Sequence, residues 1–394
     1  MEKNGMRALT ISYFGCIDPK YSRNKTNIDG LRAVGVTVHE VIVSTPVTPL
    51  NAATHIGAFP LIKRVLHKFK ILPLLLTKHQ EIMESDAIFV GYPGQFDMPF
   101  AYLIAKFYGK KLVFDPVILM FNALSNDIGV IKKGSFSTNL LKCFEKYIMS
   151  LPDVIIASTI EQKKFFIDQV EVREEKIKVA YLAADNAIYK PVETKRKVNK
   201  FKVVYYGLFT PLHGIPHIIE AARMCQSNQN IVFQMVGKGQ LYQESRARAD
   251  KAGLTNIEFY PDMNESNSME LLQQADVFLG FMESNDTVLR EIPNKVYQGM
   301  ALGTVVITGD SPAIRTVFTN RENIYIVPVA NGAALAEAIL DMAEHPELAE
   351  KIKSNSYNLF NSRFTPKAIG GVLKAQILEL TKGEYLKSRP ALKH

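Results

Sequence analysis

Residues 201–222 read FKVVYYGLFTPLHGIPHIIEAA, and this stretch decides the fold. A short apolar run ends at Gly207, a loop continues through Gly214, and a helix is expected from His217. An apolar strand followed by a glycine turn and a helix is the repeating unit of a parallel sheet covered by helices. The stretch therefore predicts an α/β domain whose loop lies at the carboxyl end of a strand, where such domains bind ligands.

The same alternation extends over nearly the whole chain. Expected strands are 7–14, 36–43, 86–92, 111–118 and 153–158, then 201–207, 230–237, 256–261, 276–281, 304–310 and 324–329. Expected helices include 24–34 and 97–108, each followed by a glycine that tolerates the left-handed helix stop. The polar, basic segment 190–202 separates the two series and is interpreted as a linker. Two doubly wound domains follow, and the tail beyond Glu344 is expected to be helical.

The composition excludes several classes of protein. The 394 residues are 47% hydrophobic and 22% charged, which is typical of a globular chain and argues against disorder. No stretch approaches the roughly 20 apolar residues of a membrane-spanning helix, and the start lacks an export signal, so we expect a cytoplasmic protein. Its three cysteines are widely spaced and have no nearby ligand partners, so we expect neither a disulfide framework nor a metal site.

The positive charge is unevenly distributed. The net charge is +8, and residues 1–190 contribute +6 of it because they hold 24 basic and 18 acidic residues. This asymmetry fits an anionic partner such as phospholipid, nucleotide or nucleic acid, and a solvated surface fits it equally well. No nucleic-acid-binding signature is present in the sequence, so we expect no nucleic-acid partner.

Two loops after strands of the second series contain paired glycines. Gly207 and Gly214 flank one loop, and Gly237 and Gly239 flank Lys238 in the loop MVGKGQ. Backbone N–H groups of such a loop, at the start of a helix, can hold phosphate. The same glycines are ordinary turn residues, so either loop alone gives weak support for a ligand site.

The sequence REIPNKVYQGMALG, which starts at Arg290, places a lysine at the beginning of a helix. Pro293 is expected to open the helix, with Asn294 and Lys295 in its first turn and Val296 facing the core. A lysine in this position opposes the helix dipole, which suggests a nearby anion that Arg290 could also reach. A solvated basic residue at a helix end is the alternative interpretation.

Together these stretches resemble glycosyltransferase family 4, a large group of retaining enzymes with the two-domain GT-B fold. EIPNKVYQGMALGTVVITGD, residues 291–310, with SPAIR after it, looks like the donor-nucleotide segment of that family. YYGLFTPLHGIPHIIEAA, MVGKGQ and YFGCIDPKYSRN, the last at residues 13–24, resemble a bacterial and archaeal branch that has a Pro-Leu-His-Gly loop. The resemblance covers almost the full chain, with the motifs in matching order and spacing.

The donor segment departs from the family pattern in its charged residues. The family has a pair of glutamates, which fall on Arg290 and Gln298 when the sequences are aligned on Pro293. In the family the second glutamate hydrogen-bonds the nucleotide ribose, a task that Gln298 could perform as donor and acceptor. Arg290 could help to neutralise the diphosphate. A phosphate-facing lysine of many relatives is replaced by His213, which binds anions strongly only when protonated.

The resemblance implies an architecture and an activity. Two doubly wound, Rossmann-like domains would face a central cleft: residues 1–190 would bind the acceptor and residues 191–365 the donor. The helical tail, residues 366–394, would cross back onto the first domain. The implied reaction moves a sugar from a UDP- or GDP-linked donor to a glycan or lipid-linked acceptor, with retained configuration, in cell-surface polysaccharide or glycolipid biosynthesis.

The nucleotide sugar is a co-substrate, and no further cofactor is expected. Lys295, Arg290 and the amides near Gly207, Gly214 and Gly239 could supply fixed positive potential for the departing diphosphate, so no metal ion is required. We expect Lys295 and Arg290 to act in catalysis together with a residue of the first domain.

That residue is expected to be Asp115, which ends a strand near the place where relatives have a histidine facing the sugar. It could orient an acceptor hydroxyl or balance positive charge in the transition state, and a turn aspartate before Pro116 is the alternative. Gly15, after the first strand, would let the first domain approach the phosphates. Arg23 and Asp127 are acceptor-binding candidates, and surface ion pairing explains either one equally well.

The stretch IGAFPLIKRVLHKFKILPLLL, residues 56–76, is both basic and apolar. Lys63, Arg64, Lys68 and Lys70 are interleaved with bulky apolar residues, and a helix is expected from about residue 61. Such helices lie on anionic membranes, so a peripheral position on the inner face of the cell membrane is one interpretation. An ordinary surface helix that buries one face in its own domain is the other.

Two other functions remain open. The missing glutamate pair would permit a non-catalytic GT-B subunit that binds a partner glycosyltransferase, and nucleotide binding without turnover would favour it. A sugar-nucleotide epimerase of similar architecture would act on the nucleotide sugar without an acceptor. A dinucleotide dehydrogenase is disfavoured because Gly15 stands alone after the first strand, without a G-x-G-x-x-G motif.

Overall fold

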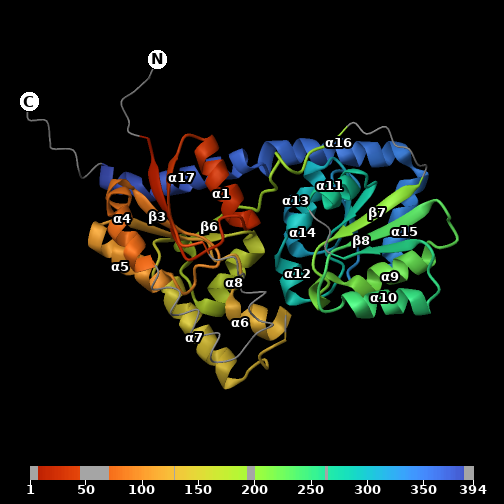
Figure 1. Ribbon diagram of the computed structural model, residues 1–394, viewed down its shortest axis with the longest axis horizontal. Helices are drawn as coiled ribbons and strands as arrows, with labels where there is room; N and C mark the ends of the chain where they lie inside the picture. The colour runs from red at the N-terminus through yellow and green to blue at the C-terminus, as the bar shows by residue number, and fades with distance from the viewer. Residues whose placement is uncertain (1–7, 45–70, 128, 193–199, 262–264, 386–394) are drawn as a thin grey trace, which may run out of the picture. The chain divides into compact units, whose positions relative to one another are not determined.

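Two six-stranded parallel sheets, each covered by helices, organise the chain (Figure 1). The structure is a computed structural model that describes residues 8–44, 71–127, 129–192, 200–261 and 265–385. The chain divides into two units, Met1–Tyr181 with Pro366–His394, and Leu182–Thr365. The predicted fold class, α/β with two doubly wound parallel sheets, is confirmed.

The first unit has the strand order β2-β1-β3-β4-β5-β6. Strands β1, β3 and β5 are buried at every residue, as expected of parallel strands covered on both faces. The elements are β1 (Thr10–Gly15), α1 (Ser22–Ala33), β2 (Thr37–Ile42), α4 (Ile71–Glu84), β3 (Ala87–Val90), α5 (Met98–Tyr108), β4 (Lys111–Phe114), α6 (Met120–Asn122), the π-helix η1 (Ala123–Asp127), α7 (Phe136–Ser150), β5 (Val154–Ala157), α8 (Ile160–Val170), η2 (Glu174–Lys176), β6 (Ile177–Val179) and α17 (Pro366–Tyr385).

The second unit has the strand order β12-β11-β10-β7-β8-β9, so its first strand, β7, lies in the middle of the sheet. The chain moves outward from β7 on one side and then returns to β10 on the other, which puts a topological switch point between β7 and β10. The elements are β7 (Phe201–Tyr206), η3 (Pro211–His213), α9 (Ile215–Met224), β8 (Ile231–Val236), α10 (Tyr242–Lys251), β9 (Ile257–Tyr260), α11 (Glu265–Gln273), β10 (Val277–Leu279), α12 (Asp286–Arg290), α13 (Asn294–Ala301), β11 (Val305–Gly309), α14 (Pro312–Val317), β12 (Tyr325–Val327), α15 (Gly332–Glu344) and α16 (Pro346–Arg363).

Every strand that the sequence predicts is present, with somewhat different bounds. Among the described residues, the structure adds β6, a short edge strand in which Ile177 is buried while Lys178 and Val179 are half-buried. Its three residues follow a charged turn, so the sequence has no apolar run there. The helix stops at Gly35 and Gly109 are confirmed, because both glycines have positive φ, of 76° and 64°.

The last helix, α17, packs against α1 in the first unit through a backbone-to-backbone approach. A Cβ atom on Gly30 would lie 2.0 Å from the carbonyl oxygen of Pro366, so only glycine fits there. Farther along α17, the Lys374 ammonium donates a hydrogen bond to the Val34 carbonyl at 2.6 Å. Gln376 donates to the Val179 carbonyl at 2.9 Å, which ties α17 to the edge strand β6 as well.

The helices of the first unit are divided between the two faces of its sheet. Parallel crossovers are right-handed, and the chain moves one way from β1 to β2 but the other way from β2 through β3, β4 and β5 to β6. Helix α1, with α17 beside it, therefore covers one face, and α4, α5, α7 and α8 cover the other.

No helix within the described residues is long and apolar enough to cross a membrane. The basic residues Lys63, Arg64, Lys68 and Lys70, for which we expected a membrane-surface helix, lie outside the described residues.

Candidate active site

The loops that follow β7 and β8 are held together by their backbones. Phe209 donates its N–H to the Lys238 carbonyl at 2.8 Å, across the two loops. A Cβ atom on Gly237 would lie 1.9 Å from the carbonyl oxygen of Gly207, and one on Gly239 would lie 2.5 Å from that of Phe209. Three of these residues, Gly207, Gly237 and Gly239, also have positive φ, so the predicted glycines are required by close backbone packing. Their contact with a ligand remains a prediction.

Gly214 joins the loop after β7 to the chain segment after β10. It has a φ of 68°, and a Cβ atom on it would lie 2.6 Å from the backbone nitrogen of Glu283. The Met282 N–H points to the carbonyl of His213 at 3.4 Å. Because β10, β7 and β8 are neighbours in the sheet, all three loops gather at one edge, on both sides of the switch point.

Lys295 brings a buried cation to these loops. It lies in the first turn of α13, as predicted, with 6% of its surface exposed. Its Nζ is 4.1 Å from the centre of the Tyr205 ring and 5.7 Å from that of Phe281, and a Cβ atom on Gly207 would lie 3.1 Å from it. The ammonium has no hydrogen-bond partner among the described residues. Burial lowers the pKa of Lys295 to about 7.

An unpaired buried ammonium is costly, so Lys295 is the feature that most needs an explanation. The interaction with the Tyr205 ring offsets part of the cost, because the face of an aromatic ring attracts a cation. An anion beside Gly207 would offset much more, since it would restore a charge partner. The solvated lysine that we weighed as an alternative is therefore excluded by its burial.

His213 is not placed to bind an anion as a positively charged side chain. Its Nδ1 contacts the Leu208 carbonyl and lies 2.8 Å from the Tyr205 hydroxyl. A carbonyl oxygen only accepts, so the proton belongs on Nδ1. Burial, with the charge of Lys295 as a second cause, lowers the pKa of His213 well below its usual 6.5. His213 is thus neutral near pH 7, stacks on Phe281 at 5.2 Å, and fixes the loop.

The remaining donor candidates lie on or near α12 and α13. Arg290, at the end of α12, is buried and donates a hydrogen bond from Nη2 to the Thr287 hydroxyl at 2.7 Å. Gln298, half-buried on α13, donates from Nε2 to the Tyr189 hydroxyl at 2.9 Å. Its Oε1 is the acceptor atom of the same amide.

The start of α13 also matches the prediction. Pro293 is its N-cap residue, and Asn294 follows with a buried Oδ1 that has no hydrogen-bond partner among the described residues. Val296 and Met300 are fully buried, as their spacing predicts, so Val296 supports α13 from the core. The structure thus brings Gly207, Gly214, Gly237, Gly239, His213 and Lys295 together.

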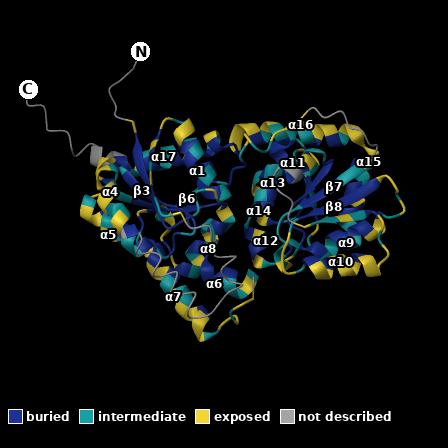
Figure 2. Cartoon of the chain, in the orientation of Figure 1, coloured by how far each residue is buried: buried dark blue, intermediate teal, exposed yellow. Residues whose placement is uncertain are grey.

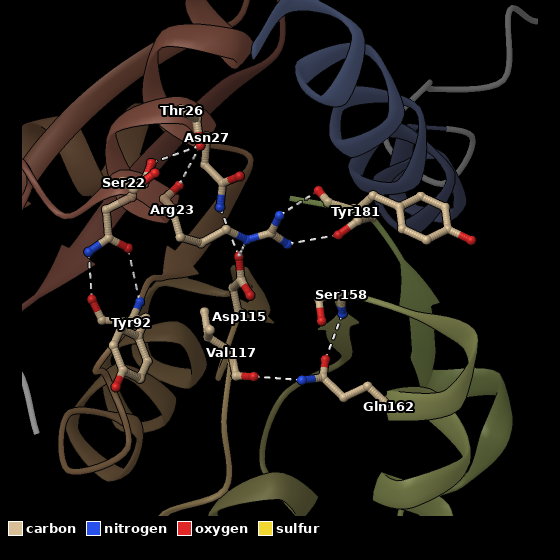
Figure 3. Close-up of polar contacts among 12 residues, drawn as sticks. Ser22, Arg23, Thr26, Asn27, Tyr92, Asp115, Val117, Ser158, Gln162 and Tyr181 are labelled. Carbon is tan, nitrogen blue, oxygen red and sulfur yellow. Dashed lines mark hydrogen bonds and ion pairs between the residues drawn. The ribbon is translucent and has the colours of Figure 1, made fainter. Parts of the chain in front are cut away.

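Arg23 and Asp115 form a buried pair, so the surface ion pairing that we weighed for Arg23 is excluded. Arg23 is 2% exposed and Asp115 is 1% exposed, so neither is a surface residue of the first unit. Figure 3 shows their network: Arg23 Nε donates to Asp115 Oδ2 at 2.7 Å, and Asn27 Nδ2 donates to the same oxygen at 2.8 Å. The other guanidinium nitrogens of Arg23 donate to the carbonyls of Tyr181, at 2.6 Å, and Ala180, at 3.0 Å.

This pair is an interior ion pair that joins α1 to the end of β4 and to the segment after β6. A buried charge pair must have its hydrogen bonds satisfied, and each guanidinium nitrogen of Arg23 has an acceptor. The roles predicted for Arg23 at the acceptor and for Asp115 in catalysis stay predictions.

The other first-unit candidates occupy loops after strands. Gly15 ends β1 with a φ of 139°, and a Cβ atom on it would lie 3.2 Å from the carboxylate of Asp97. Asp127 is half-buried at the end of η1, where its carboxylate lies 3.4 Å from the Asn122 amide. Both stay candidates without further support.

Several residues that shape the loop after β4 were not predicted from the sequence. Val117 has a φ of 60°, unusual for a β-branched residue, and its carbonyl accepts a hydrogen bond from Gln162 at 2.6 Å (Figure 3). Glu145 of α7 is fully buried and accepts from the backbone N–H groups of Met120, at 2.6 Å, and Phe121, at 2.8 Å. The only sequence signal for Glu145 is a lone carboxylate among apolar residues of a helix.

The two parallel sheets, with loops gathered at the carboxyl ends of β10, β7 and β8, correspond to the two-domain GT-B fold. Residues 189–359, nearly all of the second unit, match the family described as glycosyl transferases group 1. Within the described residues, no group of three or more His, Cys, Asp or Glu side chains could hold a metal ion.

The relatives share parts of the chain or its fold. A chitobiosyldiphosphodolichol beta-mannosyltransferase of Candida albicans is 22% identical over 245 residues, which are 57% of this chain and 53% of that protein. A phosphatidyl-myo-inositol mannosyltransferase of Mycobacterium leprae is 27% identical over 149 residues, 37% of this chain and 36% of that protein. The chain therefore spans about half the length, or less, of these curated relatives.

A solved structure extends the likeness to nearly the whole chain. HepE of Anabaena in complex with UDP superposes with a TM-score of 0.67 at 17% identity, over 95% of this chain and 100% of that chain. At this identity the likeness shows the fold.

Proposed function

We propose that this protein is a retaining glycosyltransferase that moves a sugar from a UDP- or GDP-linked donor to a glycan or lipid-linked acceptor. The reaction would serve cell-surface polysaccharide or glycolipid biosynthesis. The observation that carries the proposal is the buried ammonium of Lys295, which has no hydrogen-bond partner among the described residues and lies beside the glycine loops at the switch point. Breaking a bond to a nucleotide diphosphate develops negative charge, which a preorganised cation in a dry site stabilises strongly.

The relatives agree with this proposal. HepE of Anabaena has been solved with UDP and with UDP-glucose, which makes UDP the first nucleotide to test. The names of the two mannosyltransferases contain a dolichol and a phosphatidylinositol acceptor, which supports a lipid-linked acceptor here.

In the proposed site, Lys295 and Arg290 neutralise the diphosphate while the loop amides near Gly207 and Gly239 donate hydrogen bonds to its oxygens. The Oε1 atom of Gln298 accepts from a ribose hydroxyl, because its amide nitrogen already donates to Tyr189. The fixed cations would carry the charge, so the reaction needs no metal ion and proceeds in EDTA.

Binding and turnover test this proposal separately. Thermal shifts with UDP, GDP and ADP identify the base, since a ligand at 100 times its dissociation constant stabilises the fold by about 2.7 kcal/mol. Incubation of the wild-type protein with the matching nucleotide sugars and a lipid extract, followed by NMR of the new linkage, tests transfer and retention. No shift with any nucleotide would overturn the proposal. A shift without turnover would point to the non-catalytic subunit, and conversion of the sugar without an acceptor would point to an epimerase.

A further inference from the structure

We propose that the outer side of α5 and α7 in the first unit is a docking surface for an anionic lipid membrane. This inference deepens the lipid-linked acceptor of the proposed function and names the surface that would bring the protein to it. Its residues come from two helices that cover the same face of the first sheet. It includes none of the basic residues between 56 and 70.

Large apolar side chains lie exposed in a row on each helix. On α5, Leu103 is 65% exposed and Phe107 is 82% exposed. On α7, Phe136 is 81%, Leu140 is 60% and Tyr147 is 55% exposed. Figure 2 shows exposed residues along both helices. Isolated exposed apolar residues are ordinary, but five large ones on two adjacent helices form a patch of the kind that marks an interaction site.

The spacing shows that this patch is a second apolar face. Residues 103 and 107 are four apart, and residues 136, 140 and 147 are four and seven apart, so each set lies on one side of its helix. Buried residues of α7 such as Glu145 and Met149 lie on the opposite side. The core therefore does not account for the exposed row.

The two rows belong to one surface. Helix α5 connects β3 to β4 and α7 precedes β5, and β3, β4 and β5 are consecutive in the sheet. Right-handed crossovers place both helices on the same face. The rings of Phe96, just before α5, and Phe144, on α7, stack at 5.3 Å, which joins the two helices.

The charge around the patch favours an anionic lipid surface over a neutral partner. Helix α5 contains Lys106 and no acidic residue. Residues 129–150 contain Lys132, Lys133, Lys142 and Lys146, and their only acidic residue, Glu145, is fully buried. Lys146 forms an ion pair with the exposed Glu171, so Lys132, Lys133 and Lys142 supply the positive charge of this segment. Exposed aromatic and aliphatic side chains that alternate with lysines can enter the headgroup region while the ammonium groups attract anionic phosphates.

Vesicle flotation without any nucleotide tests the surface. The double variant Phe107→Ser/Phe136→Ser should partition at least about tenfold less onto phosphatidylcholine vesicles containing phosphatidylglycerol, because two large apolar side chains no longer insert. The matched control Met224→Ser/Val372→Ser removes two exposed apolar residues elsewhere, on α9 and α17, and should float like the wild type. All substituted residues are exposed, so circular dichroism should show unchanged folds.

A charge variant completes the test. Lys132→Gln/Lys133→Gln should lower partitioning onto anionic vesicles by about fivefold per lysine and leave binding to pure phosphatidylcholine unchanged. Flotation of the Phe107→Ser/Phe136→Ser variant at the wild-type level would overturn the proposal. So would a wild-type protein that binds neither vesicle, or a concentration-dependent dimer that this variant abolishes, which would assign the surface to a second copy. Nucleotide binding is measured separately, so this surface and the proposed function can fail independently.

Discussion

Replacing Lys295 with methionine should make the empty protein more stable and abolish its response to the nucleotide. Methionine keeps much of the length of the side chain but removes the buried charge. The pKa of Lys295 falls from 10.5 to about 7 on folding. At about 1.4 kcal/mol per pH unit, the cost of burying the charged form approaches ~5 kcal/mol, which is an upper bound. We expect Lys295→Met to raise the free energy of unfolding by at least ~1 kcal/mol at pH 6.

The stability difference between Lys295→Met and the wild type should depend on pH in a definite direction. The unfolded chain keeps the Lys295 proton up to about pH 10.5, whereas the folded protein loses it near pH 7. Between these pH values unfolding takes up a proton, so the wild-type protein gains stability as the pH rises, and this gain is lost as the pH falls towards 7. Below pH 7 both states are protonated and this contribution is constant. The difference between Lys295→Met and the wild type should therefore shrink from pH 7 to pH 10.

Urea unfolding followed by circular dichroism measures the stability, and a thermal shift with UDP or GDP measures binding. The control Lys251→Met removes an exposed lysine of α10, and its stability should change by less than about 0.5 kcal/mol. The reasoning is refuted if Lys295→Met is less stable than the wild type at pH 6, because the ammonium would then have a strong partner. A normal nucleotide shift in Lys295→Met would remove the residue from the proposed site.

Three further predictions concern the residues that shape the two units. Asp115→Asn should lower the free energy of unfolding in urea by about 3–5 kcal/mol, because it leaves a buried guanidinium without its charge partner. The control Asp310→Asn, in an exposed pair, should lower it by at most about 1 kcal/mol. Similar losses in the two variants would contradict a buried pair. Gly237→Ala should lower the thermal midpoint much more than Gly253→Ala, because both have positive φ but only the first new methyl group meets backbone; equal losses would argue against the close loop packing. The pH dependence of nucleotide affinity near pH 7 should be the same in His213→Gln as in the wild type, since His213 is neutral there. A shift of this pH dependence in the variant would show that His213 ionises.

Much of the fold could be predicted because its signals are local. An apolar run such as 231–236 forms a buried strand wherever it lies in a parallel sheet, and a glycine after a helix indicates its end. The edge strand β6 was not predicted, because its single buried residue, Ile177, makes no periodic pattern. The start of α13 was predicted from Pro293, whose fixed φ suits a first helical turn.

The positions of several site residues were predicted, but their charge states and partners were not, because these depend on burial. Residue type and position along the chain placed the paired glycines in loops after strands and Lys295 in the first turn of a helix. They left open whether His213 is protonated and whether Arg23 pairs at the surface, because a sequence does not show which polar groups face each other. The structure makes His213 neutral through burial beside Lys295 and gives Arg23 an interior partner in Asp115.

The sequence by itself determined the α/β class, the order of the strands along the chain and the loops at their carboxyl ends, because hydrophobic periodicity and glycine turns act over a few residues. Only the tertiary structure decided the charge states and partners of the buried groups, because these depend on contacts between residues far apart in the chain. Arg23 reaches Asp115 across 92 positions, and Lys295 lies on the Tyr205 ring from another strand-to-helix unit. The same holds for the exposed rows on α5 and α7, which form one surface because the sheet order places their helices side by side.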